Sequence, residues 1–297
     1  MPAIIYSRHY EVDLGGHVWP ITKYRLIAAR LTGAGHIHRA SLVEPELCSW
    51  DDLELVHTPE YLAKVRDGLL SESEIQTLEL PWIPELVEGF RLMTGGTCRA
   101  AELALDAGVA VHLGGGLHHA FPDHGEGFCL FNDVAVAIRR LQRTGQARKA
   151  AVIDCDVHHG NGTAFIFAAD PSVFTFSIHQ QDNYPAWKPA SDLDVGVADR
   201  TGDDEYLAKL ANALPKVMRS GPDVIFYLAG ADPFQEDRLG GLALTLDGLR
   251  RRDRLVFDAA AATGIPVATV LAGGYAARVD DTVSAHVNTV IEALRSS

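Results

Sequence analysis

Short apolar runs alternate with amphipathic segments along nearly the whole chain. The apolar runs are continuous, which is typical of strands that are buried on both faces of a parallel sheet. The segments between them have helical spacing and sufficient length to form helices. Strands are predicted at residues 3–6, 109–113, 150–153, 173–178, 223–229 and 266–271. Helices are predicted at residues 97–107, 133–144, 204–219 and 245–263.

This order of elements predicts an α/β fold with a central, mostly parallel sheet and helices on both faces. No linker rich in Pro or Ser, low-complexity tract or internal repeat divides the 297 residues. We therefore expect a single domain over residues 1–297. The region 31–88 is less regular, but Thr58 and Pro59 are predicted to begin a helix as its N-cap and first residue.

The composition excludes several classes of protein. With 47% hydrophobic and 22% charged residues, the chain is typical of globular proteins, and no apolar run reaches the ~20 residues of a membrane span. The N-terminus lacks the pattern of a signal peptide, so we expect a cytoplasmic protein. A net charge of −13 argues against nucleic acid as a partner. It favours solubility or, as an alternative, attraction of cationic substrates.

The four cysteines are scattered, without C-x-x-C spacing, and favour neither a disulfide framework nor a cysteine-bound zinc. The informative residues instead follow the predicted strands. The ends of five strands carry glycines, titratable groups or both: 114–119 with His118 and His119, 154–162, His179, 230–232 and 272–275. Because ligands of open α/β sheets bind at the carboxyl ends of the strands, these residues together predict an active site.

The stretch 154–162 points to a metal. Alternate side chains of an extended segment share a face, so Asp154, Asp156 and His158 point the same way. Burial of such groups is costly unless a metal or a dense hydrogen-bond network compensates. Asp156, His158 and Asp232 would supply three ligands and leave one position open for water, as in catalytic zinc sites. His159 is interpreted as a structural residue.

The remaining polar residues fit hydrolysis of an amide. His118 and His119 are adjacent and are candidates for a general base and acid. Asp154 and Asn161 are candidates to orient the two imidazoles. Tyr275, which follows two glycines, is a candidate to donate its hydroxyl to a developing oxyanion.

These residues resemble those of the zinc-dependent histone deacetylase superfamily, which has an arginase-like three-layer α/β fold. The matching segments are GGGLHHAFPDHGEGFCLFND, VIDCDVHHGNG, AGADPFQEDRLGG and LAGGY, with weaker agreement in YSRHY, LVHTPEYL and TGGT. The resemblance covers roughly residues 3–290. The short chain and the EDRLGG segment resemble the class IV, histone deacetylase 11-like branch.

The resemblance implies roles for individual residues. Zinc is implied at Asp156, His158 and Asp232, with His119 as the general base, His118 as its partner held by Asp154, and Tyr275 on the scissile carbonyl. Gly127 and Phe128 are implied in the tunnel for the acyl-lysine stem. A potassium ion is implied near Asp154, Asp156, His158, Ser177 and Ile178. Ferrous iron suits the two-Asp, one-His set as well as zinc does.

The chain departs from the family pattern at two places. Asn161 stands where many members have Asp, so we hypothesise that His119 is less basic here than in those relatives. The aromatic-rich rim loop is replaced by residues 180–185. Within it, Tyr184 is interpreted as a wall of the substrate pocket, with a buried structural tyrosine as the alternative.

The function expected is removal of acetyl or longer acyl groups from N-acyl-lysine in proteins or peptides. Deacetylation of small amines such as acetylpolyamines is the alternative. A non-catalytic binding module is disfavoured because the three ligands, both histidines and Tyr275 are all present. A dimanganese arginase-like hydrolase is disfavoured because the order here is D-x-D-x-H rather than D-x-H-x-D. The oligomeric state is left open.

Overall fold

The computed structural model describes residues 2–296 and contains an eight-stranded sheet in which every pair of neighbouring strands is parallel. The strands lie in the order β2-β1-β3-β8-β7-β4-β5-β6. Their bounds are β1 Ala3–Ile5, β2 Leu42–Val43, β3 Val109–His112, β4 Ala150–Asp154, β5 Val173–Gln180, β6 Leu193–Val197, β7 Val224–Leu228 and β8 Val267–Val270. The predicted parallel sheet is confirmed.

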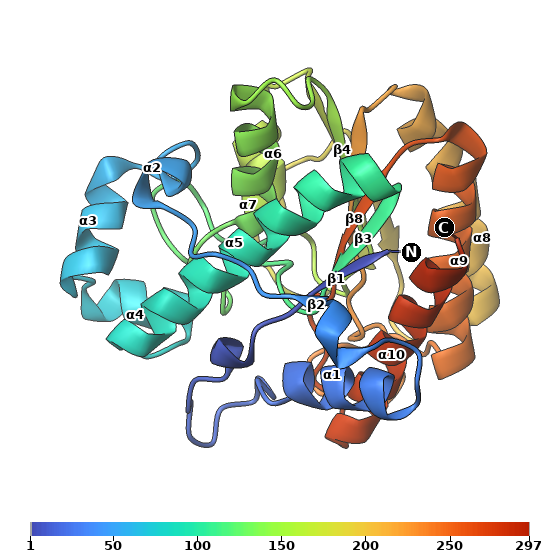
Figure 1. Ribbon diagram of the computed structural model, residues 1–297, viewed down its shortest axis with the longest axis horizontal. Coiled ribbons are helices and arrows are strands. Elements are labelled where there is room, and N and C mark those ends of the chain that lie inside the picture. Colours follow the sequence, from blue (N-terminus) through green and yellow to red (C-terminus); the bar gives the residue numbers. More distant parts are fainter. Residues whose placement is uncertain (1, 297) are drawn as a thin grey trace.

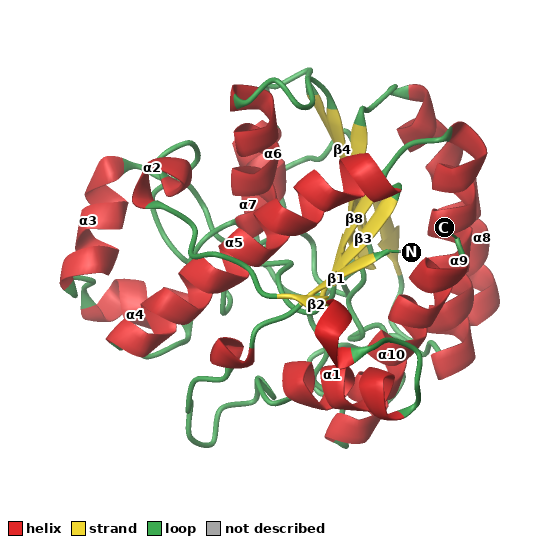
Figure 2. Cartoon of the chain, in the orientation of Figure 1, coloured by secondary structure: helices red, strands yellow, loops and turns green. Residues whose placement is uncertain are grey.

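Helices cover both faces of the sheet, which gives three layers (Figures 1 and 2). The helices α5, α6 and α7 lie on one face, α1, α8, α9 and α10 lie on the other, and α2, α3 and α4 form a group beyond α5. Their bounds are α1 Lys23–Gly33, α2 Trp50–Leu53, α3 Pro59–Asp67, α4 Glu72–Leu78, α5 Pro84–Ala107, α6 Asp133–Arg143, α7 Asn161–Phe167, α8 Asp203–Arg219, α9 Leu246–Thr263 and α10 Val279–Arg295.

The alternation of side chains along each strand creates two hydrophobic cores. Val152 of β4 packs with Phe226 of β7 in the core on the α5 face, whereas Ile153 and Ile225 pack in the core on the α8–α10 face. All four side chains are buried, and each large apolar one contributes roughly 1.5–3 kcal/mol through burial. Strands that are covered by helices on both faces have continuous apolar sequences, and for this reason they could be predicted.

Six strands and four helices agree with their predicted positions, apart from their ends. Thr58 is the N-cap of α3 and its hydroxyl accepts the N–H of Tyr61. The helix predicted at 97–107 is the second half of α5, whose first half contains Gly95 and Gly96. A Cβ at Gly96 would collide with the His112 ring, so close packing against β3 explains a glycine that is unfavourable for a helix.

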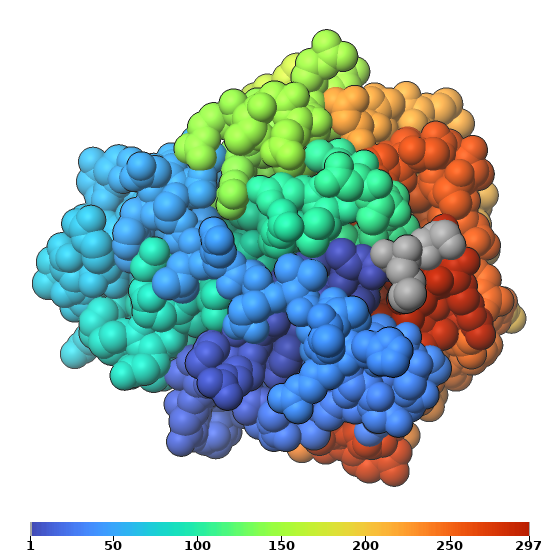
Figure 3. Space-filling model, viewed as in Figure 1, coloured from blue at the N-terminus to red at the C-terminus, as the bar shows by residue number. Residues whose placement is uncertain are grey.

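The sequence analysis did not predict the helices α1, α2, α4, α7 and α10 or the strands β2 and β6. The strand β6 lies at the edge of the sheet, and its sequence mixes exposed Asp194 with partly buried Leu193. It therefore lacks the continuous apolar run of an interior strand. Helix α1 packs against α10, and Figure 3 shows the N-terminal segments in blue on the surface beside the red C-terminal helices.

Residues 2–296 contain no helix with both the length and the apolar character that crossing a membrane requires. The carboxyl ends of the parallel strands lie at one edge of the sheet, where the loops after β3, β4, β7 and β8 meet. The fold therefore gathers segments separated by more than a hundred residues at this edge.

Candidate functional site

Two carboxylates and an imidazole form a compact cluster at this edge. Asp156 and His158 lie in the loop between β4 and α7, and Asp232 follows β7. His158 Nδ1 lies 3.1 Å from an oxygen of Asp156 and 3.7 Å from an oxygen of Asp232. All three ligand atoms lie within 4.8 Å of one another, and the residues are buried. The geometry thus brings together the three residues predicted to hold a metal.

Backbone amides hold the two carboxylates in place. Val157 N–H donates to Asp232 Oδ1 at 2.9 Å, and Gly273 N–H donates to Asp156 Oδ2 at 2.9 Å. Asp232 Oδ2 is buried and has no hydrogen-bond partner within residues 2–296. Burial and the nearby charge of Asp156 raise the pKa of Asp232 well above its usual value. An unpaired oxygen in this position fits a bound cation, which would compensate the two carboxylates.

The loop after β8 approaches the cluster very closely at Gly273. A Cβ there would collide with the carboxylate of Asp232 and would lie 2.7 Å from Asp156 Oδ2. Only glycine leaves room for the amide that binds Asp156.

The two adjacent histidines lie beside the cluster in different electrostatic environments. His118 Nδ1 lies 2.7 Å from Asp154 Oδ2, and its Nε2 lies 3.0 Å from His119 Nε2. Burial alone lowers the pKa of His118, but the carboxylates of Asp154 and Asp156 outweigh it and raise the pKa to about 9. Burial, followed by the charges of His118 and His158, lowers the pKa of His119 well below its usual value. The pKa values of the two adjacent imidazoles are therefore displaced in opposite directions.

A chain of hydrogen bonds fixes the tautomer of His119. Its Nδ1–H donates to the amide oxygen of Asn161 at 2.7 Å, which leaves Nε2 as the lone-pair atom. The amide nitrogen of Asn161 donates to Glu126 Oε1 at 2.7 Å, and Tyr184 donates its hydroxyl to the same oxygen at 2.9 Å. Glu126 therefore determines which way the Asn161 amide faces, and through it the orientation of His119.

Tyr275 lines the same pocket and is held by its backbone. Its N–H donates to Asp237 Oδ2 at 2.6 Å. Burial, together with Asp232 and Asp156, raises the pKa of Tyr275 well above its usual value, so the phenol stays protonated. Lys23 Nζ lies 5.6 Å from the centre of the Tyr275 ring and donates to the carbonyl of Ala272 at 2.8 Å. The hydroxyl is thus available as a donor.

A pocket of about 190 Å³ leads to these groups. Gly127, Phe128 and Tyr184 line it, and the Tyr184 ring lies 5.0 Å from the ring of His119. The exposed side chain of Glu79 also lines it, and Glu79 borders the adjoining pocket in the direction of Trp187. The opening therefore has both an aromatic wall and a carboxylate on its rim.

The residues implied for potassium are neighbours in the structure. Asp154 of β4 and Ser177 of β5 are partners in the strand register, and Ile178 follows Ser177. Ser177 Oγ lies 2.9 Å from His179 Nδ1. Asp156 and His158 follow β4 directly.

Four residues of this region were missed by the sequence analysis: Lys23, Glu79, Glu126 and Asp237. Lys23 is fully buried although lysine is ordinarily exposed, so no local pattern identifies it. Glu126 lies inside the segment that also contains Gly127 and Phe128. Because Glu126 adjoins these residues in the sequence, it could have been considered as a pocket residue. Its contact with Asn161 is evident only from the structure.

Comparisons with known proteins identify one matching family and several similar chains. The Histone deacetylase domain family matches residues 17–292. An uncharacterized protein of Picosynechococcus sp. is 44% identical over 95% of this chain and 95% of its own length. Histone deacetylase 2 of Arabidopsis thaliana is 31% identical over 92% of this chain and 74% of its own length.

Among solved structures, the HDA15 HD domain is similar with a TM-score of 0.82 and 25% sequence identity. The similarity covers 100% of this chain and 90% of that one. The sheet and its helical layers are therefore those of a histone deacetylase domain, which confirms the predicted arginase/deacetylase-like architecture.

Proposed function

Because the chain belongs to the histone deacetylase domain family and is a hydrolase of the deacetylase kind, we propose that it is a zinc-dependent lysine deacylase. It removes acetyl or longer acyl groups from N-acyl-lysine side chains of proteins or peptides. The observation that carries this proposal is the convergence of Asp156, His158 and Asp232 with His119 and Tyr275 on one pocket. The class IV assignment is part of the proposal and rests on the segment at residues 236–241.

Asp156, His158 and Asp232 would hold the metal. When bound, zinc would lower the pKa of a water molecule and polarise the acyl carbonyl. Two carboxylates and one imidazole suit Zn²⁺, and ferrous iron suits the same donors. We extend the proposal to a potassium ion near Asp154 and Ser177, whose adjacency in the sheet supports it.

His119 performs the proton transfers. Its Nε2 lone pair accepts a proton from the attacking water while a bond forms between the water oxygen and the acyl carbon. The same imidazolium then donates this proton to the lysine nitrogen as the carbon–nitrogen bond breaks. The products are a carboxylic acid and a free amine, and transfer of the acid proton to the amine at neutral pH gives a carboxylate and an ammonium ion. Asn161 keeps Nδ1 protonated through both steps, so the tautomer needed for each is maintained.

His118 and Tyr275 stabilise charge during the reaction. Against the effect of burial, the carboxylates of Asp154 and Asp156 raise the pKa of His118 to about 9, and a positive charge on His118 would lower the proton affinity of His119, which favours transfer of the proton from His119 to the leaving nitrogen. Tyr275 donates its hydroxyl to the acyl oxygen as negative charge develops there. Phe128 and Gly127 provide an apolar passage for the lysine stem, and Tyr184 forms another part of its wall.

Two substitutions test the proposal. His119→Ala removes the base and Tyr275→Phe removes the donor, and each is expected to lower kcat by about 100-fold or more on an acetyl-lysine peptide. The zinc content, measured by mass spectrometry, is expected to remain at the wild-type level because neither residue is a ligand. Tyr6→Phe, a substitution outside the pocket, is the control. Wild-type turnover in both variants would require the catalytic proposal to be abandoned.

A further inference from the structure

The catalytic pocket adjoins a second pocket with a volume of about 320 Å³, which we call the side pocket. Glu79 and Tyr184 line both pockets, and the side pocket continues along Pro185 and Ala186 to Trp187. Because Glu79 is exposed at the rim of the catalytic pocket, the two pockets are connected near the opening. A substrate that extends out of the catalytic pocket therefore lies within reach of the side pocket.

Three aromatic side chains lie together where the side pocket ends at Trp187. These are Phe121, Phe165 and Trp187, which we call the aromatic shelf, and their ring centres lie 5.2 to 5.9 Å apart. Phe121 is buried, and its ring is nearly parallel to that of Trp187, with 16° between the planes. In contrast, Phe165 is 45% exposed and Trp187 is 59% exposed. Phe121 thus supports two outer rings that offer apolar surface to a ligand.

The position of the aromatic shelf distinguishes it from other exposed apolar residues. The exposed large hydrophobic side chains of residues 2–296 are Leu47, Leu69, Phe165 and Trp187. Apolar side chains that are exposed singly are normal on a protein surface. Phe165 and Trp187 instead contact each other, and Trp187 lines a pocket that adjoins the catalytic one. Contiguous apolar surface in such a place is typical of a ligand-binding site.

Hydrogen bonds hold the segment that carries Trp187 in a defined conformation. Lys188 Nζ donates to the carbonyl of Asn183 at 2.6 Å and to the carbonyl of Pro185 at 2.5 Å. The side-chain amide of Asn183 donates to the carbonyl of Leu239 at 2.8 Å, which ties the segment to the loop after β7. A surface that is ordered before binding loses less conformational entropy when a ligand binds.

The connection to the catalytic pocket favours a peptide substrate as the occupant. When an acyl-lysine side chain enters the catalytic pocket, the main chain of its peptide stays at the opening, beside Glu79 and Tyr184. Residues that flank the lysine can then reach the aromatic shelf. A second copy of this chain fits less well, because a stable interface buries about 800 Å² per partner. Full burial of one aromatic side chain supplies only about 150–250 Å², and both outer rings are partly covered already.

We propose that the aromatic shelf binds an aromatic or large aliphatic side chain that flanks the acyl-lysine of a peptide substrate. This inference rests on the proposed function, since it takes an acyl-lysine peptide as the substrate, and it adds a sequence preference to that function. Trp187 and Phe165 determine specificity from outside the catalytic pocket. A small acylated amine without such a side chain gains nothing from the shelf.

A set of peptides tests the proposal. The reference is a heptapeptide of glycines with a central acetyl-lysine, and six further peptides carry one phenylalanine at each of the other positions. The wild-type protein is expected to prefer phenylalanine at one or two positions, with kcat/KM about two- to tenfold above that for the reference. Trp187→Ala is expected to abolish this ratio and Phe165→Ala to reduce it. The change is expected mainly in KM, because the shelf binds the ground state and the transition state alike.

Leu69→Ala is the matched control, because Leu69 is a large apolar side chain that is 66% exposed and lies outside both pockets. It is expected to keep the wild-type ratio, and Trp187→Phe, which retains an aromatic ring, is expected to keep most of it. Thermal unfolding verifies the fold of each variant.

Three outcomes overturn the aromatic shelf while leaving the proposed function intact. The first is turnover of the reference peptide with no preference for phenylalanine at any position. The second is an equal preference in wild type and Trp187→Ala. The third is a wild-type dimer, measured by sedimentation, that Trp187→Ala converts to a monomer, which assigns the surface to a second copy of the chain. If no acyl-lysine peptide is hydrolysed at all, the proposed function fails and the shelf with it.

Discussion

Asn161 and Glu126 lie one behind the other beside His119: Asn161 contacts the imidazole, and Glu126 contacts Asn161. The neutral amide accepts from His119, and the negative charge lies one residue further away on Glu126. The Asn161 amide orients the imidazole of His119, but it raises the pKa of that imidazole less than an adjacent carboxylate would. This arrangement agrees with the low pKa of His119, whose largest cause is burial.

Asn161→Asp is expected to move the acidic limb of the kcat/KM profile to higher pH by about one unit, since an adjacent carboxylate stabilises the imidazolium. Protonated His119 cannot accept a proton, so a higher pKa removes activity at a higher pH. The substitution is best made together with Glu126→Gln, because the new carboxylate would otherwise face Glu126 Oε1. Glu126→Gln alone is the control, and an acidic limb that does not move contradicts the hypothesis.

The loop between β8 and α10 contacts a proposed metal ligand and also lines the substrate pocket. Its Gly273 amide binds Asp156, and its Tyr275 enters the pocket two residues later. A sheet of parallel strands makes this possible because β8 and β7 end at the same edge. The backbone of this loop therefore acts as an outer partner of the metal ligands.

Gly273→Ala is expected to lower the affinity for catalytic zinc by about tenfold or more, as loss of an outer-shell contact typically does. The added methyl group would displace the Asp232 carboxylate and the amide that binds Asp156. Competition with a chromogenic chelator measures the affinity. Gly33→Ala is the control, since a Cβ there meets nothing within 4 Å. Unchanged zinc affinity in Gly273→Ala would show that the close approach has no functional consequence.

The net negative charge of the whole molecule attracts cations, including cationic substrates that approach the pocket. The net charge is −13, and the exposed carboxylate of Glu79 lies on the pocket rim. These features are the observations that favour small acylated polyamines as the alternative substrate. Attraction of this kind acts over the Debye length, which shrinks from about 30 Å in 0.01 M salt to about 3 Å in 1 M salt.

For acetylspermidine, kcat/KM is expected to fall by about tenfold or more across this salt range, while kcat changes little. A neutral acetyl-lysine peptide is expected to show a much smaller decrease, and Glu79→Gln is expected to reduce the salt dependence for the polyamine. The same assays compare the two substrate classes at low salt. If activity on acetylspermidine greatly exceeds activity on acetyl, octanoyl and myristoyl-lysine peptides, the polyamine becomes the preferred substrate class.

Local patterns were sufficient for the interior strands and for much of the candidate site. A strand covered on both faces must be apolar throughout, so β4 and β7 were visible as continuous runs. The polar residues that end these runs were equally visible, because charged groups after a buried strand require a compensating partner. Asp156, His158 and Asp232 were identified in this way.

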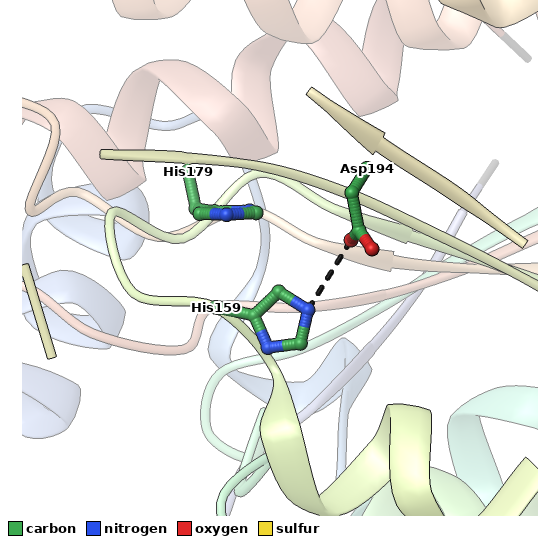
Figure 4. A group of neighbouring side chains, drawn as sticks. All are labelled: His159, His179 and Asp194. Carbon is green, nitrogen blue, oxygen red and sulfur yellow. Dashed lines mark hydrogen bonds and ion pairs between the residues drawn. The ribbon is translucent and has the colours of Figure 1, made fainter. Parts of the chain in front are cut away.

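Contacts between distant segments were not encoded in any local pattern. The edge strand β6 was missed because one side of it meets solvent, and with it the partner of His159. His159 was interpreted as a structural residue, and the fold places its Nε2 atom 3.2 Å from Asp194 Oδ1 on this strand (Figure 4). The chain fixes its strands, glycines and ligand types through short-range sterics and burial, but strand order and register decide which polar groups meet. Strand order and register depend on how all the strands and helices pack together.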